Sequence, residues 1–146
     1  MPVFRLTQQP FFPHTDLAEE SGLLAVGGDL KPDRLIAAYS QGIFPWYSEG
    51  DPLLWWFTSP RLVLFPEEFR VSKRLARTIR QKKFTITFDT AFTEVINNCA
   101  RNNSPNRDET WIVEEMKKAY IQLHELGYAH SVECWQDGEL AGAVSY

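Results

Sequence analysis

The sequence predicts a mixed α/β protein with a loop-rich first section and a more regular second section. Residues 84–88 alternate apolar and polar side chains, as a half-buried strand does. Later segments repeat apolar residues at helical spacing, and Asp137-Gly138 separates two apolar runs in the manner of a tight hairpin turn. With 146 residues, including ten Phe, five Tyr and five Trp, the chain is long and aromatic enough to bury a core.

Residues 1–60 are predicted to form a small α/β domain that is rich in glycine, proline and aromatic residues. Three residues have helical spacing: Leu35, Ala38 and Tyr39. We expect Asp33 to cap the start of this helix and Gly42 to end it. Short apolar runs and turns account for the rest of the section.

Residues 61–146 are predicted to follow the order β-α-β-α-α-β-β. The first strand is expected at 61–65. The following helix is expected to be capped by Ser72, with three apolar residues facing inward: Val71, Leu75 and Ile79. The next strand is expected to bury Phe84, Ile86 and Phe88.

Two further helices and a hairpin complete the second section. Asp89 or Thr90 is expected to cap a helix whose apolar face consists of Phe92, Val95, Ile96 and Cys99. A longer helix should open at Thr110 and end at Gly127, with one face made of Ile112, Met116, Tyr120 and Leu123. The hairpin is expected to join 129–135 to 139–146. The last strand stops at the final residue without a cap, which suggests that the fold continues beyond it.

Positive charge is concentrated in one helix. Residues 70–83 hold seven Lys or Arg and no acid, and removing these seven charges from the net charge of −4 leaves −11 on the other 132 residues. Such a face on an acidic protein is suited to phosphates, although a solvated helix face is the plain alternative. The candidate phosphate-binding residues are Lys73, Arg74, Arg77, Arg80, Lys82 and Lys83.

Several functional classes are disfavoured by the sequence. It has no apolar run long enough for a membrane span and no signal peptide, so we expect a cytoplasmic protein. Cys99 and Cys134 form neither a disulfide framework nor a metal pair. His124-Glu125 begins a zinc motif that the next residues do not complete, so His124 is expected on a helix surface. Gly27-Gly28 lacks a nucleotide-binding pattern and is expected to be a tight turn. We therefore expect no cofactor and no metal.

Aromatic residues gather between Tyr39 and Phe57, where seven occur in 19 residues. Most tryptophans fill cores or anchor interfaces. Trp46 is harder to explain in this way because it lies in a turn bounded by glycine and proline, and Trp111 follows a polar loop at a helix start. Exposed indoles near a cationic helix are suited to stacking an unpaired nucleobase while the cations hold its backbone. The residues thus favour binding of a single-stranded RNA end.

These stretches resemble the leucyl/phenylalanyl-tRNA–protein transferases of bacteria. The resemblance is carried by GLLAVGGDLKPDRLIAAYSQGIFPWY (22–47), DPLLWW (51–56), FTITFDTAFTEVINNCA (84–100), TWIVEEMKKAYIQLHELGYAHSVECW (110–135) and GELAGAVSY (138–146). It implies transfer of leucine or phenylalanine from aminoacyl-tRNA to proteins that begin with Arg or Lys, which tags them for degradation by the N-degron route. It also implies a monomer whose second section is the first part of a GNAT-like acyltransferase domain.

The resemblance assigns expected roles to individual residues. Trp46 and Trp111 would flank the terminal adenine, and Tyr39 and Tyr120 would line the same substrate site. The basic helix would hold the acceptor stem through phosphates, which carry no sequence information. The chain departs from the family at Trp56-Phe57-Thr58-Ser59-Pro60-Arg61, which lacks an acid that usually follows the double tryptophan.

A larger departure concerns the catalytic groups. The family's GESMFS-like and DCQ-like segments, with the Glu, Asp and Gln assigned to acceptor binding and catalysis, would lie beyond Tyr146. We therefore expect a C-terminally truncated member with no catalytic residue within the chain. The alternative is a non-catalytic remnant that binds the 3′ end of tRNA. A GNAT enzyme that uses acyl-CoA is disfavoured because RNNSPN (101–106) has no glycine to cradle a pyrophosphate.

Overall fold

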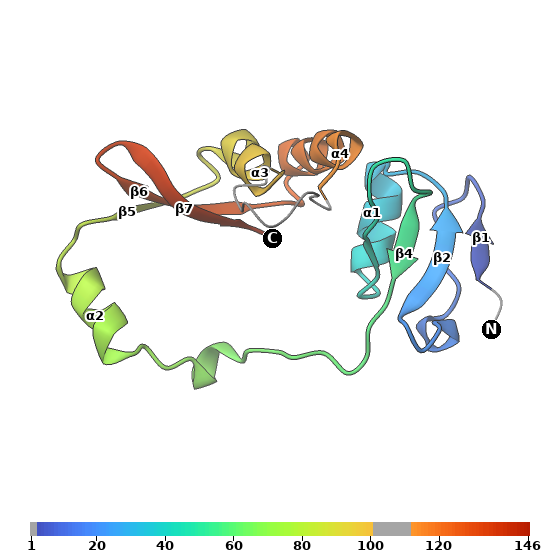
Figure 1. Ribbon diagram of the computed structural model, residues 1–146, viewed down its shortest axis with the longest axis horizontal. Helices are drawn as coiled ribbons and strands as arrows, with labels where there is room; N and C mark the ends of the chain where they lie inside the picture. Colours follow the sequence, from blue (N-terminus) through green and yellow to red (C-terminus); the bar gives the residue numbers. More distant parts are fainter. Residues whose placement is uncertain (1–2, 101–111) are drawn as a thin grey trace.

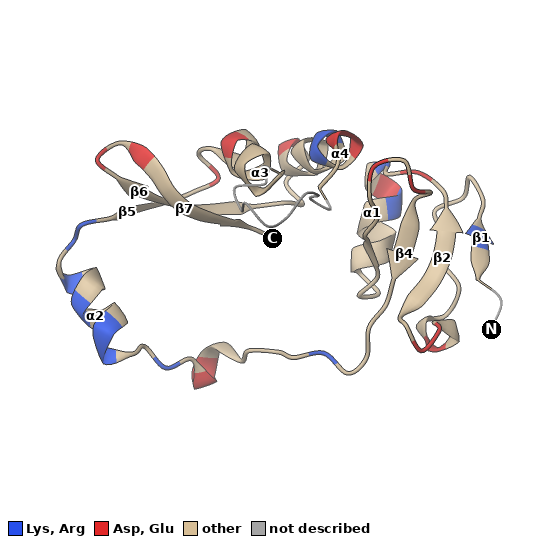
Figure 2. Ribbon diagram, in the orientation of Figure 1, with Lys and Arg blue, Asp and Glu red and all other residues tan. Residues whose placement is uncertain are grey.

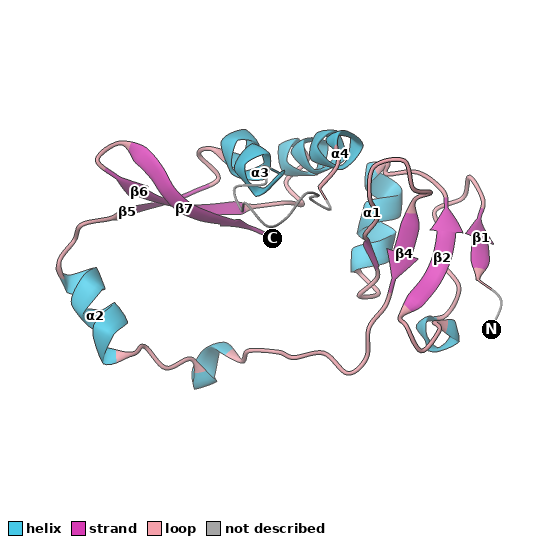
Figure 3. Ribbon diagram, in the orientation of Figure 1, coloured by secondary structure: helices cyan, strands magenta, loops and turns pink. Residues whose placement is uncertain are grey.

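A computed structural model describes residues 3–100 and 112–146 and confirms the mixed α/β class (Figure 1, Figure 3). In chain order the strands and helices are β1 (Phe4–Leu6), β2 (Leu23–Gly27), α1 (Pro32–Tyr39), β3 (Phe44–Pro45), β4 (Leu54–Trp56), α2 (Lys73–Arg80), β5 (Thr85–Phe88), α3 (Phe92–Ala100), α4 (Glu114–Glu125), β6 (Ser131–Gln136) and β7 (Glu139–Ser145). Short 3-10 turns lie at Thr15–Leu17 and Pro66–Glu68. None of the helices within the described ranges has the length and apolar character needed to cross a membrane.

The first sheet has the order β1-β2-β4-β3, with β1 parallel to β2 and the other pairs antiparallel. Trp55 of β4 is completely buried, and its indole Nε1 donates to the Gly27 carbonyl at 2.9 Å. Gly27 is the last residue of β2 and Gly28 follows it; both have φ of +83°, a conformation that glycine adopts without strain. The tight turn expected at these two glycines stays a prediction. This sheet supports α1, which lies beside β3.

Helix α1 starts differently from the prediction. Its N-cap is Lys31, which makes no side-chain capping bond, and Asp33 lies inside the first turn, so the expected Asp33 cap is wrong. Pro32 explains the start, because proline is well suited to the first helical position, where no N–H partner is needed. The end agrees with expectation, since Gly42 follows the helix with φ of +73°.

The second sheet is antiparallel, with the order β5-β6-β7. Helices α3 and α4 cover one of its faces (Figure 1). The predicted hairpin is confirmed: Asp137 and Gly138 form the two-residue turn with φ of 53° and 83°, as a type I′ turn requires. The longer helix is also confirmed as α4, followed by Gly127 at φ of +80°, while the expected opening at Thr110 lies outside the described residues.

The segment between the sheets is an extended arc that carries α2 away from both of them (Figure 1). The Ser72 cap is confirmed, since its hydroxyl accepts from the Leu75 N–H at 3.2 Å. The strand expected at 61–65 is wrong, because these residues form an exposed loop. The expected inward face of α2 is wrong as well: Val71, Leu75 and Ile79 are exposed, Ile79 by 61%.

The burial of β5 and the capping of α3 also differ from expectation. Phe84, Ile86 and Phe88 are exposed, and Thr87 instead lies on the helix-covered face opposite Glu133. Neither Asp89 nor Thr90 caps α3, because both side chains bond to β6 residues. Periodicity correctly grouped residues by face but did not show which face the helices cover.

One hydrophobic cluster links the two sections of the chain. Leu35 and Ala38 of α1 belong to the same buried cluster as Phe92 and Ile96 of α3 and Leu123 of α4. The two sheets themselves fall on either side of residue 60. A domain boundary between 1–60 and 61–146 stays a prediction.

Candidate ligand-binding site

An apolar cavity of about 860 Å³ lies where α1, α3, α4 and the end of β7 meet. Its described lining consists of Ile36, Tyr39, Ser40, Phe92, Ile96, Cys99, Ile112, Met116, Tyr120, Leu123, Tyr128, Ala129, Ala143, Val144, Ser145 and Tyr146. A concave, mainly apolar cavity with a few polar groups is typical of a small-molecule site. The helical spacing of these apolar residues places them on the sides of α3 and α4 that line the cavity.

Two of the tyrosines that line this cavity contact each other through their hydroxyls. Tyr39, the last residue of α1, and Tyr120 of α4 form a hydrogen bond between their hydroxyl oxygens. Their rings meet edge to face, with centroids 6.3 Å apart and planes at 76°. The sequence resemblance placed both residues in one site, and the structure brings them together although they are 81 positions apart.

Burial raises the pKa of both Tyr39 and Tyr120, so both hydroxyls stay protonated at neutral pH. In a hydroxyl pair one member donates and the other accepts, and the accepting member keeps a hydrogen that it can donate to a ligand. The pair is therefore suited to binding a carbonyl or ribose oxygen beside an apolar group. No Asp, Glu or His side chain occurs in the described lining of the cavity.

Trp46, one of the two predicted tryptophans, stands apart from this cavity. Trp46 is 53% exposed, as expected, and its ring lies 6.0 Å from that of Trp56, whose indole Nε1 donates to the Trp46 carbonyl at 2.7 Å. Trp46 is not among the described residues that line the cavity. Trp111 lies outside the described residues. Stacking of an adenine between the two indoles therefore stays a prediction.

The basic segment is the strongest concentration of positive charge in the part of the chain that the structure describes (Figure 2). Lys73, Arg74, Arg77 and Arg80 lie on α2, and Lys82 and Lys83 follow it. All six side chains are exposed. The structure does not bring them to the cavity, because α2 stands on the extended arc.

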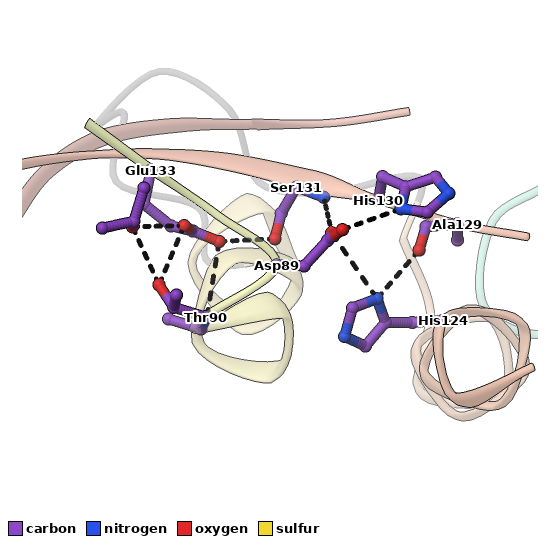
Figure 4. A network of polar contacts seen from close by, with 9 residues as sticks. Asp89, Thr90, His124, Ala129, His130, Ser131 and Glu133 are labelled. Atoms are coloured by element: carbon purple, nitrogen blue, oxygen red, sulfur yellow. Dashed lines mark hydrogen bonds and ion pairs between the residues drawn. The ribbon is translucent and has the colours of Figure 1, made fainter. Parts of the chain in front are cut away.

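A second polar cluster, which sequence reasoning treated as weak, lies under α3 (Figure 4). Glu133 of β6 has no solvent exposure. One carboxylate oxygen accepts from the hydroxyls of Thr87 at 2.5 Å and Thr90 at 3.0 Å. The other accepts from the Ser131 hydroxyl at 2.5 Å and the Ala91 N–H at 3.3 Å.

Burial alone raises the pKa of Glu133, but the hydrogen bonds from Ser131, Thr87, Thr90 and Ala91 outweigh burial and lower the pKa to about 2. Glu133 thus remains ionised and ties β5 and the start of α3 to β6. The alternation of Ser131 and Glu133 around Val132 was the only sequence signal for this arrangement. It could not identify partners more than 40 positions away.

Asp89 connects this cluster to two histidines. Its carboxylate accepts from the His130 Nδ1 and from the Ser131 N–H, both at 2.8 Å, and these bonds lower the pKa of Asp89. His124 stacks on Phe92 with ring centroids 4.2 Å apart, and its Nδ1 donates to the Ala129 carbonyl at 2.8 Å. His124 thus lies on a helix as expected, with its side chain 23% exposed and packed against Phe92. Across residues 3–100 and 112–146 no group of His, Cys, Asp and Glu is placed to hold a metal ion.

These features define a mixed α/β protein with an apolar ligand cavity, a tyrosine pair at that cavity and a separate cationic helix. The family model for leucyl/phenylalanyl-tRNA protein transferase matches residues 63–145, and the model for the N-terminal domain of the same family matches residues 28–59. The chain belongs to the leucyl/phenylalanyl-tRNA protein transferase family.

Individual relatives agree with this assignment. Proteins named leucyl/phenylalanyl-tRNA–protein transferase from Desulfatibacillum aliphaticivorans and Syntrophobacter fumaroxidans are 56% and 57% identical over 144 residues, which cover 99% of this chain and 62% of each relative. The protein of the same name from Maridesulfovibrio salexigens is 54% identical over 145 residues, which cover 99% of this chain and 60% of the relative. The chain thus spans about three fifths of the length of these relatives.

Proposed function

We propose that this protein takes part in the transfer of leucine or phenylalanine from aminoacyl-tRNA to the N-terminal Arg or Lys of acceptor proteins, which marks them for degradation. Family membership supports the reaction class. The observation that carries the proposal is the apolar cavity beside Tyr39 and Tyr120. An amino acid that has a hydrophobic side chain and is esterified to a ribose through its carboxyl group needs this combination of apolar surface and neutral hydroxyl donors.

The reaction is the aminolysis of an ester. The free α-amine of the acceptor attacks the ester carbonyl carbon, the amine loses a proton, and the ribose oxygen leaves and gains a proton. Because such an ester is already reactive, positioning and stabilisation of the developing negative charge supply most of the acceleration. In this proposal the Tyr39–Tyr120 pair orients the aminoacyl-adenosine end.

The remaining residues of the proposal bind RNA. Trp46 and Trp111 would flank the terminal adenine, where each base stack contributes about 1–3 kcal/mol. The cationic face of α2, with Lys73, Arg77 and Arg80 at its centre, would contact acceptor-stem phosphates. Phosphate contacts suit an enzyme that accepts both leucyl- and phenylalanyl-tRNA, since they do not read sequence.

A second candidate is a tRNA-end binder without transfer activity. The observation that favours it is the lack of any carboxylate or imidazole in the described lining of the cavity. Both candidates require the cavity to bind the aminoacyl end. They differ in whether an acceptor amine is then activated.

Incubation of the chain with radiolabelled Phe-tRNA and a peptide that begins with Arg separates the two candidates. If the chain is an active transferase, labelled Phe should appear on this peptide. None should appear on the matched peptide with an acetylated N-terminus. Salt-sensitive binding of Phe-tRNA without product would support the binder. Absence of both product and tRNA binding would contradict both candidates.

A further inference from the structure

A second cavity, of about 490 Å³, shares Tyr39 in its lining with the apolar cavity. It is formed by the turn after α1, by β3 and by the loop after β4, and its described lining is Tyr39, Gly42, Ile43, Phe44, Thr58, Pro60, Arg61 and Leu62. Tyr39 is the residue that lines both cavities. A ligand that passes Tyr39 could therefore occupy the two cavities at once.

Arg61 is the one charged side chain in the described lining of this cavity. Its Nε donates to the Thr58 carbonyl at 3.2 Å and to the Thr58 hydroxyl at 3.3 Å, and its Nη2 donates to the Gly42 carbonyl. The guanidinium carbon also lies 5.3 Å from the ring centre of Phe44 and 5.8 Å from that of Phe57. The side chain is thus held in one orientation before any ligand arrives.

This arrangement leaves the positive charge of Arg61 unneutralised. None of its partners on Thr58 and Gly42 is a carboxylate, and no acid lines the described cavity. The contacts described use Nε and Nη2, so Nη1 keeps its donors for a ligand. A fixed guanidinium with free donors is suited to a phosphate group, which accepts charge-assisted hydrogen bonds in a planar fork.

We propose that Arg61 binds the phosphodiester that precedes the terminal adenosine of the aminoacyl-tRNA, while the apolar cavity beyond Tyr39 holds the aminoacyl group. This assignment rests on the proposed function. A terminal ribose carries the aminoacyl ester and the 5′ phosphate on different oxygens, so the two groups leave one sugar in different directions. Two cavities that share the Tyr39 wall, one apolar and one cationic, match those two groups.

The test compares two non-hydrolysable ligands, 3′-amide-linked phenylalanyl-adenosine with a free 5′ hydroxyl and the same compound with a 5′ methyl phosphate. Calorimetry should show that the chain binds the phosphate-bearing ligand about tenfold more tightly, as expected for a charge-assisted contact. Arg61→Gln should remove this preference and leave binding of the neutral ligand unchanged within about twofold. Arg5→Gln, which alters an exposed arginine of β1, is the matched control and should keep the preference.

A second variant avoids the structural contacts of Arg61. Leu62 is fully exposed at the same cavity, so Leu62→Glu disturbs no packing but places a carboxylate near the phosphate. It should reduce the preference severalfold, whereas Leu62→Gln should retain it. If Arg61→Gln fails to fold, this pair still decides the question.

The outcomes separate the two proposals. Equal binding of both ligands by the unmodified chain, or a preference that survives both Arg61→Gln and Leu62→Glu, would overturn the phosphate assignment and leave the proposed function standing. Failure to bind either ligand would overturn the proposed function and the Arg61 assignment with it. Inorganic phosphate should compete only weakly with the phosphate-bearing ligand; competition as strong as that of the ligand itself would indicate a general anion site and overturn the assignment to RNA.

Discussion

Replacing Glu133 by glutamine should destabilise the fold by about 2–4 kcal/mol at neutral pH. The carboxylate accepts four hydrogen bonds, two on each oxygen. An amide keeps only one acceptor oxygen, so two donors would face an NH₂ group. If the NH₂ faces Ser131, that hydroxyl can turn to accept, but the Ala91 N–H then loses its partner. The expected loss of stability therefore has two parts: one buried donor loses its acceptor, and the remaining hydrogen bonds are weaker because their acceptor is no longer charged.

The pH dependence gives this prediction a distinctive signature. The pKa of Glu133 is lowered from 4.5 to about 2 in the folded state, so the stabilisation is complete above the unfolded pKa and is lost as pH falls from about 4.5 to about 2. The free energy of unfolding of the unmodified chain should therefore fall across this interval. Glu133→Gln cannot protonate there, so the difference between the two chains should shrink towards pH 2.

Urea unfolding followed by tryptophan fluorescence, at several pH values between 2 and 7, measures both effects. Glu139→Gln, on the neighbouring strand and exposed, is the matched control and should change the free energy of unfolding by less than about 0.5 kcal/mol. If Glu133→Gln is as stable as the control at pH 7, the four hydrogen bonds to the carboxylate do not stabilise the fold as described. A stability difference that stays constant down to pH 2 would refute the assignment of the low pKa.

Three further predictions concern the buried Arg34 of α1, the tyrosine pair and the basic helix. Arg34→Met should cost about 3 kcal/mol in urea unfolding, because the buried guanidinium donates to two carbonyls of the N-terminal segment at 2.7 and 3.1 Å; a loss below 1 kcal/mol would contradict this. Tyr39→Phe and Tyr120→Phe should each weaken the binding of amide-linked phenylalanyl-adenosine, measured by calorimetry, about threefold to tenfold. The double variant should lose less affinity than the product of both losses, because the two hydroxyls share one hydrogen bond. Unchanged affinities would show that the tyrosine pair does not contact this ligand. The double variant Arg77→Glu with Arg80→Glu should weaken tRNA binding in a filter assay. The salt dependence of the binding constant, as a log–log slope, should fall by about one unit per lost phosphate contact. Binding of the adenosine ligand should not change, and equal losses for both ligands would refute the acceptor-stem role.

Local sequence signals predicted the elements that depend on few neighbours. The Asp137-Gly138 turn and the Ser72 cap are confirmed, because each requires only residues within three positions. The start of α1 was wrong because Pro32 fixes the first turn without a side-chain cap at Asp33.

Burial was harder to predict, because periodicity groups residues by face without showing what covers that face. Leu75 and Ile79 share one side of α2 as predicted, yet both side chains are exposed. In β5 the helices cover the Thr87 face, since its hydroxyl donates to Glu133, and the phenylalanines lie on the open face. The hydrophobic pattern therefore could not predict that Glu133 is buried and accepts hydrogen bonds from Thr87 and Thr90.

The candidate site was predicted in part. The sequence resemblance selected Tyr39 and Tyr120, and the structure places their hydroxyls in contact. Arg61 was noticed in the sequence only as part of a departure from the family pattern. Its role depends on Thr58, Gly42 and two aromatic rings that converge only in the folded chain.

In the proposed function the cavity beside Tyr39 and Tyr120 holds the aminoacyl end of the RNA. A crystal structure of the chain with amide-linked phenylalanyl-adenosine would locate this end. We expect the phenylalanyl ring inside the cavity between α1, α3 and α4, with an oxygen of the ligand within hydrogen-bond distance of a tyrosine hydroxyl. A ligand bound elsewhere, with this cavity empty and the Tyr39–Tyr120 bond unchanged, would contradict it.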